Sequence, residues 1–216
     1  MSGLPSMQKR EQIIVWAFLA GVTVIQGALI VWSFPQTLAA DPGPLERHIF
    51  APPGNPLAWL LATAFAAAYI TYAALRSPVI RTHMLAPQRW RGLLVLRALA
   101  IVMAFVTGFF EEALFRKYLM DIAMHHGQGP LMQVVISATI FGLAHGIWGI
   151  AGGNWRAALG PIVSTALLGS ALAIVYLAGG RSLAPCVFAH ILINLFLEPW
   201  LIITSATNSW GRRTPP

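Results

Sequence analysis

The amino-acid sequence predicts an all-α fold, a polytopic membrane helical bundle of about six transmembrane helices. Of the 216 residues, 57% are hydrophobic and only 10% are charged, and the mean hydropathy is +0.68. A soluble domain of this size carries about 25% charged residues. The apolar residues gather in segments of roughly 20, the length that an α-helix needs to cross a hydrocarbon core of ~30 Å. We therefore expect a single integral membrane domain over residues 1–216.

Six segments meet or approach this length, and breaks rich in glycine or proline separate most of them. They are Ile13–Ser33, Leu57–Arg76, Leu93–Ile122, Leu131–Ile150, Pro161–Ala178 and Leu183–Thr204. The first segment is longer than the ~7–15-residue core of a signal peptide, so we expect a retained helix. Pro161 suits the first turn of the fifth helix, where the missing N–H of proline has no cost.

The net charge of +7 is interpreted as a topology signal. The basic residues are scattered between apolar runs, and no basic stripe with interleaved aromatic residues indicates a nucleic-acid partner. Six crossings place both chain ends on the side that holds most of the basic residues, namely Lys9, Arg10, Arg76, Arg81, Arg89, Arg91, Arg156, Arg212 and Arg213. By the positive-inside rule we expect both termini in the cytoplasm.

Two adjacent glutamates, Glu111 and Glu112, lie inside the third apolar segment. A charge near the centre of a bilayer costs at least ~2.5–3.5 kcal/mol on insertion scales, so it is rarely there without a use. The apolar pattern resumes after the pair, and we expect the helix to continue to about Ile122. Glu112 can pair with Arg116 one turn later. Glu111 is rotated by ~100° from it and has no local partner, so it needs one on a neighbouring helix.

Two other segments carry polar groups at a similar depth. Phe141 and His145 on the fourth segment, and His190 and Asn194 on the sixth, are each spaced i, i+4 and therefore share a helix face. Counted from the segment ends, the polar groups of all three helices lie about 11–21 Å deep, in the middle band of the membrane. Small residues beside the first histidine favour close helix packing: Gly142, Gly146 and Gly149.

These residue types suit hydrolysis by an activated water molecule. A partly desolvated carboxylate is a stronger base, so Glu111 can take a proton from water while His145 helps to hold that water. The oxyanion that forms on a scissile carbonyl needs preorganised donors, which His190 and Asn194 can supply. Water has to reach this depth, so we expect a cavity that opens to one side.

The three motifs, in this order on separate helices, resemble the CAAX protease and bacteriocin-processing (CPBP/Abi) family of intramembrane glutamic endopeptidases. The motifs are Glu-Glu-x-x-x-Arg at 111–116, Phe-x-x-x-His at 141–145 and His-x-x-x-Asn at 190–194. The resemblance covers residues 100–200, the expected catalytic core.

The resemblance implies a role for each motif residue. The catalytic residues would be Glu111 as general base, His145 as its partner in water activation, and His190 and Asn194 as oxyanion stabilisers. The structural or substrate-orienting residues would be Glu112, Arg116 and Phe141. The family works without a metal-bound water, so no metal and no other cofactor are expected. The expected partners are a peptide or protein substrate at or in the membrane and the lipid bilayer, without nucleic acid.

Other interpretations remain open from the residues alone. One carboxylate and two histidines can ligate zinc, although no His-Glu-x-x-His is present. A non-catalytic immunity or partner-binding role is also associated with this family. Intramembrane Glu and His residues can relay protons in transporters, but such proteins more often show a repeated half with interrupted helices. Bacterial members mostly lack a prenylated substrate, so the resemblance does not imply a prenyl group.

Overall fold

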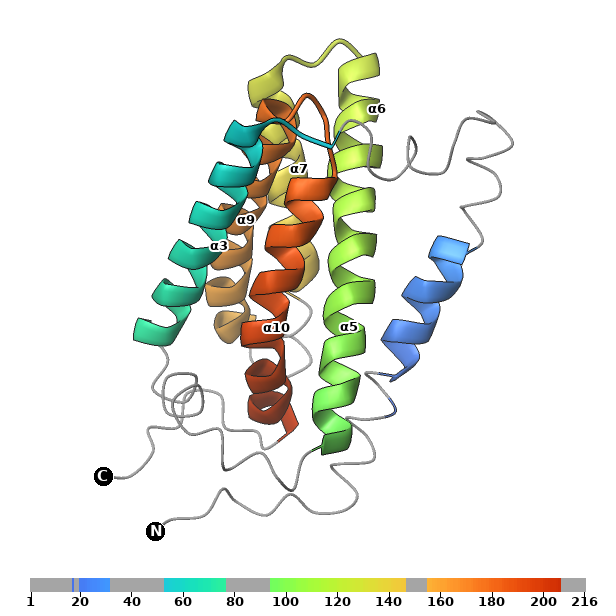
Figure 1. Ribbon diagram of the computed structural model, residues 1–216, viewed down its shortest axis with the longest axis vertical. Coiled ribbons are helices and arrows are strands. Elements are labelled where there is room, and N and C mark those ends of the chain that lie inside the picture. The colour runs from blue at the N-terminus through green and yellow to red at the C-terminus, as the bar shows by residue number, and fades with distance from the viewer. Residues whose placement is uncertain (1–16, 18–19, 32–52, 77–93, 147–154, 207–216) are drawn as a thin grey trace.

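The computed structural model describes residues 17, 20–31, 53–76, 94–146 and 155–206, and every regular element in these ranges is a helix (Figure 1). The elements are a helix Ala20–Val31, α3 (Pro56–Arg76), α5 (Leu94–Glu112), the π-helix η2 (Ala113–Tyr118), α6 (Leu119–His125), α7 (Pro130–His145), α9 (Trp155–Ala178) and α10 (Ala184–Ala206). The all-α fold class is therefore confirmed.

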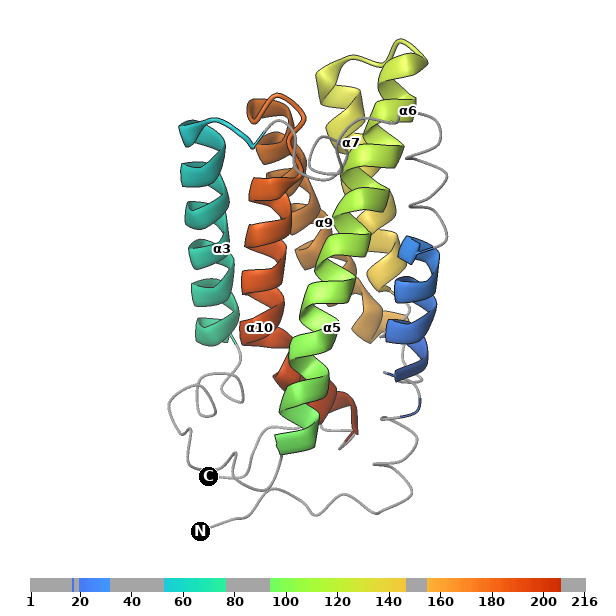
Figure 2. The same ribbon diagram turned by 45° about the vertical axis from the view of Figure 1, so that its right-hand side comes forward.

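The long helices stand side by side in one bundle, as the two views in Figures 1 and 2 show. Helix α10 packs against α3, α5 and α9, and α7 packs against α9 and against the continuous η2–α6 segment. Helix α3 contributes a row of fully buried small residues to the core, Ala58, Ala62 and Ala66. Their i, i+4 spacing puts them on one face, where small side chains allow a close approach of the neighbouring helices.

The third predicted segment continues past the two glutamates, as expected. Helices α5, η2 and α6 follow one another without a break from Leu94 to His125, three residues beyond the predicted end. The π-helical turn η2 has i→i+5 hydrogen bonds, a geometry that occurs frequently at functional sites. The hydroxyl of Ser137 on α7 donates to the backbone carbonyl of Phe115 in this turn at 2.9 Å, and both residues are buried. This bond fixes η2 against α7.

Two helix boundaries differ from the prediction. Helix α7 ends at His145, whereas the apolar pattern predicted Ile150; residues 147–150 lie outside the described residues. The N–H of Gly146 bonds the carbonyl of Leu143 at 3.0 Å, so the backbone tightens into a turn there. Helix α9 begins at Trp155, so Pro161 lies inside the helix and not in its first turn.

Two described helices are long and apolar enough to cross a membrane, Pro56–Arg76 and Ala158–Ala178. The helices Ala20–Val31 and α7 (Pro130–His145), and the part Ala184–Leu197 of α10, are apolar but shorter. Large apolar side chains on the outer faces are exposed, among them Leu60, Phe105, Leu143, Val163 and Leu167. This outward apolar surface is what a lipid environment stabilises. The count of six crossings stays a prediction.

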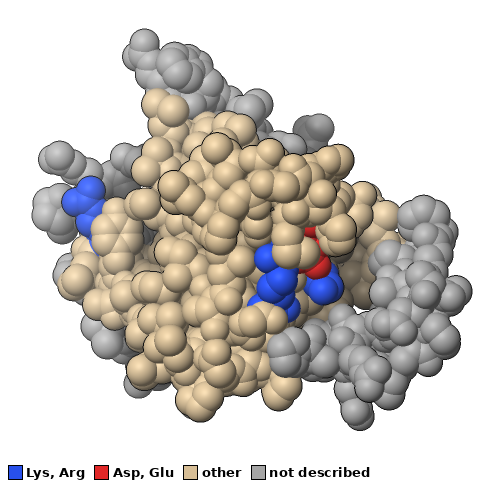
Figure 3. Space-filling model, turned by 90° about the horizontal axis from the view of Figure 1, so that it is seen from above, with Lys and Arg blue, Asp and Glu red and all other residues tan. Residues whose placement is uncertain are grey.

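A polar network ties together the end of the bundle that is uppermost in Figure 1. Asp121 on α6 accepts hydrogen bonds from Arg181 Nε at 2.8 Å and from the Tyr176 hydroxyl at 3.1 Å. Arg181 also donates to Gln133 on α7 at 3.1 Å, and Lys117 pairs with Asp121 at 3.0 Å. Figure 3, which views this end, shows acidic and basic side chains gathered in one place. The network holds α6, α7 and the α9–α10 turn in one arrangement.

Glycines allow α7 and α9 to pack closely, as predicted for the neighbourhood of His145. A Cβ added to Gly142 would lie 2.7 Å from the carbonyl oxygen of Ile162, and one added to Gly146 would lie 2.8 Å from the Ile162 side chain. Gly149 lies outside the described residues. Backbone atoms cannot move aside as side chains can, so the contact at Gly142 is the more restrictive of the two.

We expect Gly142→Ala to lower the free energy of unfolding by about 1–3 kcal/mol, because the added methyl group overpacks the α7–α9 interface. Gly160→Ala is the matched control, since Gly160 is an exposed residue of α9 whose added Cβ would meet nothing within 4 Å. Thermal unfolding of the detergent-solubilised protein measures both. Equal stability of the two variants would contradict the close packing at Gly142.

Candidate active site

A close contact between α5 and α10 brings the polar residues of the two helices together. A Cβ on Gly108 of α5 would lie 2.9 Å from Cγ1 and 3.3 Å from the backbone nitrogen of Ile191 on α10. The absence of a side chain at Gly108 therefore permits this approach. Ile191 adjoins His190, and Gly108 lies one turn before Glu112. The helix contact thus sets the distance between these two polar side chains.

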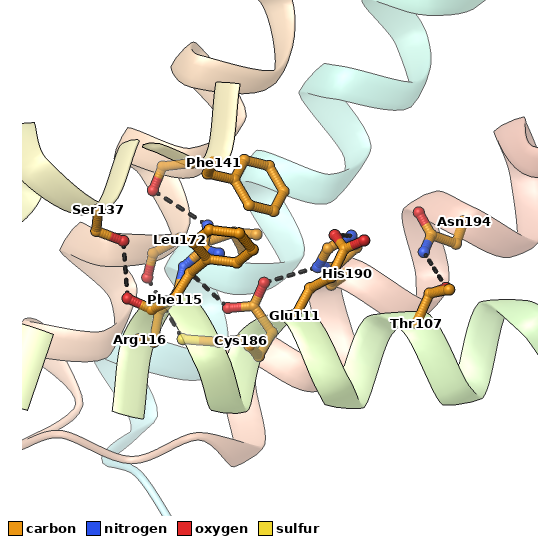
Figure 4. A network of polar contacts seen from close by, with 12 residues as sticks. Thr107, Glu111, Phe115, Arg116, Ser137, Phe141, Leu172, Cys186, His190 and Asn194 are labelled. Atoms are coloured by element: carbon orange, nitrogen blue, oxygen red, sulfur yellow. Dashed lines mark hydrogen bonds and ion pairs between the residues drawn. The ribbon is translucent and has the colours of Figure 1, made fainter. Parts of the chain in front are cut away.

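Glu112 is the centre of a buried charged group, and its partners Arg116 and His190 are labelled in Figure 4. Its Oε2 lies 3.0 Å from Arg116 Nε and its Oε1 lies 2.6 Å from His190 Nδ1. The side chains of Glu112 and Arg116 have no exposed surface, and that of His190 is 3% exposed. The Arg116 guanidinium also donates to the carbonyl of Gly169 at 3.3 Å and lies 4.6 Å from the centre of the Phe141 ring. These contacts compensate a carboxylate that has lost its water.

Glu111 points toward two histidines from other helices. Its Oε2 lies 3.6 Å from His190 Nε2 and 3.7 Å from His145 Nε2. Both distances exceed the 2.7–3.2 Å of direct hydrogen bonds, and Oε2 forms no hydrogen bond within the described residues. The side chains of Glu111 and His145 are 17% and 21% exposed, more than those of the other members of the group, although Glu111 Oε2 itself is buried. The partner that the sequence required for Glu111 is therefore a pair of imidazole rings.

The hydrogen bonds of the two rings determine which nitrogen faces Glu111. His145 Nδ1 lies 2.8 Å from the carbonyl oxygen of Phe141, which can only accept, so Nδ1 carries a proton. His190 Nδ1 faces the Glu112 carboxylate, which is already paired with Arg116 and also accepts. In each neutral ring Nε2 is then unprotonated and directed at Glu111 Oε2. A water molecule has two protons, so it can donate to Glu111 Oε2 and to one of these ring nitrogens.

Phe141 packs the two histidines in place. Its ring is fully buried, with its centre 4.5 Å from that of His145 and 5.8 Å from that of His190. It also meets the edge of Phe115 at 5.1 Å. The residue predicted to be structural or substrate-orienting therefore contacts both imidazole rings and Arg116.

Asn194 lies one turn beyond His190 on α10 and has a partner that sequence reasoning missed. Its Nδ2 donates to Thr107 Oγ1 on α5 at 3.3 Å. Thr107 is buried and is spaced i, i−4 from Glu111, which is the signal that would have found it. The described residues contain no group of three or more His, Cys, Asp or Glu side chains arranged to hold a metal ion.

We expect Arg116→Met to lower the free energy of unfolding by about 3–5 kcal/mol, because it leaves the buried charge of Glu112 without its cation. The double variant Glu112→Gln/Arg116→Met should recover much of this loss, since the introduced amide is neutral and its oxygen still accepts from His190. Lys117→Met is the matched control, because Lys117 also pairs at i, i+4, with Asp121, but is 51% exposed; its effect should stay below about 1 kcal/mol. If the double variant were as unstable as Arg116→Met alone, the unpaired charge of Glu112 would not be the cause of the lost stability.

One of three comparisons with known proteins finds a match. The family model described as type II CAAX prenyl endopeptidase, Rce1-like, matches residues 93–196. This range includes all three sequence motifs and confirms the family that they resemble. Comparison with curated proteins and with solved structures gives no significant match. With its apolar helices, the protein is an integral membrane protein. Residues 93–196 therefore belong to the Rce1-like family of CAAX-protease-type membrane endopeptidases.

Proposed function

We propose that this protein is an intramembrane glutamic endopeptidase, which hydrolyses a peptide bond of a membrane-associated protein or peptide with water activated by Glu111. The observation that carries the proposal is the convergence of His145 Nε2 and His190 Nε2 on Glu111 Oε2 at 3.7 and 3.6 Å. A water molecule bound here can donate one proton to Glu111 Oε2 and the other to His145 Nε2. The protein is proposed to act in a bacterial inner membrane, with both termini in the cytoplasm.

In this mechanism Glu111 takes a proton from the water molecule, while His145 holds it through Nε2. The water oxygen forms a bond to the scissile carbonyl carbon, and the carbonyl becomes an oxyanion. When the C–N bond breaks, the nitrogen of the leaving amine receives the proton held by Glu111. The products are a carboxylic acid and an amine, so one water molecule is consumed for each bond cleaved.

The oxyanion is proposed to accept hydrogen bonds from His190 and Asn194. Nδ1 of His190 already faces Glu112 at 2.6 Å, so donation from Nε2 requires the doubly protonated ring. The negative charge of Glu112 offsets the positive charge of that ring. Glu112 therefore supports catalysis through His190 and needs no contact with the substrate.

Glu111→Gln should abolish cleavage and leave the fold intact, because the amide has a similar shape but cannot take a proton from water. Membrane and secreted peptides are compared by mass spectrometry between cells that express the wild-type protein and cells that express the variant. A substrate that accumulates uncut only with the variant identifies the target. Retained cleavage would refute the mechanism, and an unchanged partner-binding or immunity phenotype without any cleavage product would favour a non-catalytic role.

His145→Gln should lower the rate of cleavage by about 10²–10⁴-fold, since it removes the ring nitrogen that faces Glu111. His125→Gln is a matched control. His125 also ends its helix and also places Nδ1 on the carbonyl four residues earlier, at 2.6 Å from Asp121 O, but its side chain is exposed. Turnover of the identified substrate measures both variants. If both variants lost a comparable part of the cleavage rate, the loss could not be assigned to the position of His145 beside Glu111.

A further inference from the structure

A second polar contact crosses the α5–α10 interface one helical turn from the glutamates. Thr107 and Glu111 are spaced i, i+4 on α5, and His190 and Asn194 have the same spacing on α10. Asn194 Nδ2 lies 3.3 Å from Thr107 Oγ1, beside the contact between Glu111 and His190 (Figure 4). Asn194 is therefore held from α5 and not only from its own helix.

The direction of donation in this contact follows from the other bond of Thr107. Its hydroxyl donates to the backbone carbonyl of Met103, one turn earlier, at 2.5 Å. A hydroxyl has a single proton, so toward Asn194 it can only accept. The amide must then present its NH₂ group to Thr107, and the opposite orientation would place two acceptor oxygens against each other. The threonine thus selects one of the two orientations of the asparagine amide.

The orientation matters because an amide nitrogen has two N–H groups. One N–H donates to Thr107. Because the amide is planar, the direction of the second N–H is then fixed as well. Within the described part of the chain, the Asn194 amide forms no other hydrogen bond. Thr107 itself is only 6% exposed, so it is shielded from competing solvent. A donor of fixed direction is what an oxyanion requires, since no reorganisation is then needed as charge develops.

We propose that Thr107 is a positioning residue, which fixes the amide of Asn194 so that its second N–H can donate to the oxyanion of the substrate. The inference rests on the proposed function, because it concerns the oxyanion formed in that reaction. Thr107 does not contact the substrate and acts through Asn194.

The activity test uses three variants. Thr107→Val keeps the shape and removes the hydroxyl, Thr107→Ser keeps the hydroxyl, and Thr165→Val is the matched control. Thr165 on α9 is partly buried and, like Thr107, donates to the carbonyl four residues earlier, at 2.7 Å from Pro161 O. Among the described residues its side chain makes no hydrogen bond to another helix. The probe is a quenched fluorescent peptide with a farnesylated cysteine four residues from its C-terminus, assayed beside the same peptide without the farnesyl group.

For Thr107→Val we expect kcat to fall about 10-fold, less than the ~10²–10³-fold cost of removing an oxyanion donor, with KM changed less than about twofold. Thr107→Ser should retain most of the activity, and Thr165→Val all of it. In an Asn194→Ala background, Thr107→Val should cause no further loss. Full activity of Thr107→Val, or an equal loss in both backgrounds, would overturn the positioning role.

A second measurement needs no substrate. The chain has four asparagines, Asn55, Asn154, Asn194 and Asn208, so selective ¹⁵N-Asn labelling gives four side-chain NH₂ signals. The signal that disappears in Asn194→Ala is assigned to this residue. Thr107→Val should shift it, whereas Thr107→Ser and Thr165→Val should not. An Asn194 signal unmoved by Thr107→Val refutes the inference whatever the peptides show. Cleavage by Glu111→Gln would instead refute the proposed function itself.

Discussion

The buried carboxylate of Glu112 is the constraint on which the site depends. A charge removed from water needs partners of opposite charge or hydrogen-bond donors close to it. Arg116 on the same helix binds one oxygen and His190 on α10 binds the other, at 3.0 and 2.6 Å. Each partner is in turn held: Arg116 by the Gly169 carbonyl and the Phe141 ring, and His190 by the close contact of Gly108 with its neighbour. The position of His190 beside Glu111 therefore follows from the contacts that neutralise the charge of Glu112.

The two adjacent glutamates thus have opposite environments. Glu112 has no exposed surface and both its oxygens lie beside cationic or protonated groups, so it is fixed. Glu111 is 17% exposed, and its Oε2 faces two ring nitrogens at distances longer than a hydrogen bond. The rotation of ~100° between successive helix residues separates a fully buried side chain from a partly exposed one. The pair therefore provides, from a single helical turn, a fixed charge and the carboxylate that we propose as the general base.

The sequence predicted the fold class and most helices because apolar length in a membrane is a strong signal. It predicted that the third helix continues past the glutamates, since apolar residues resume at Ala113. It could not predict the end of α7, because the apolar run continues beyond His145 while the backbone turns at Gly146. The contact of Glu112 with His190 was not predicted, because Arg116 already supplied one partner for Glu112. A carboxylate has two oxygens, and the second one contacts His190. Thr107 was missed because a hydroxyl inside an apolar helix usually bonds its own backbone, as this one also does.

The contact between Glu112 and His190 joins residues that are 78 positions apart in the chain. At synthesis rates of about 5–20 residues per second, His190 emerges roughly 4–16 s after Glu112. During that interval the third helix carries its buried carboxylate without its later partner. Arg116 lies on the same helix, one turn away, and is made within about a second of it at these rates. Of the two partners of Glu112, Arg116 is therefore present as soon as this helix is made, whereas His190 is present only after α10 has been made.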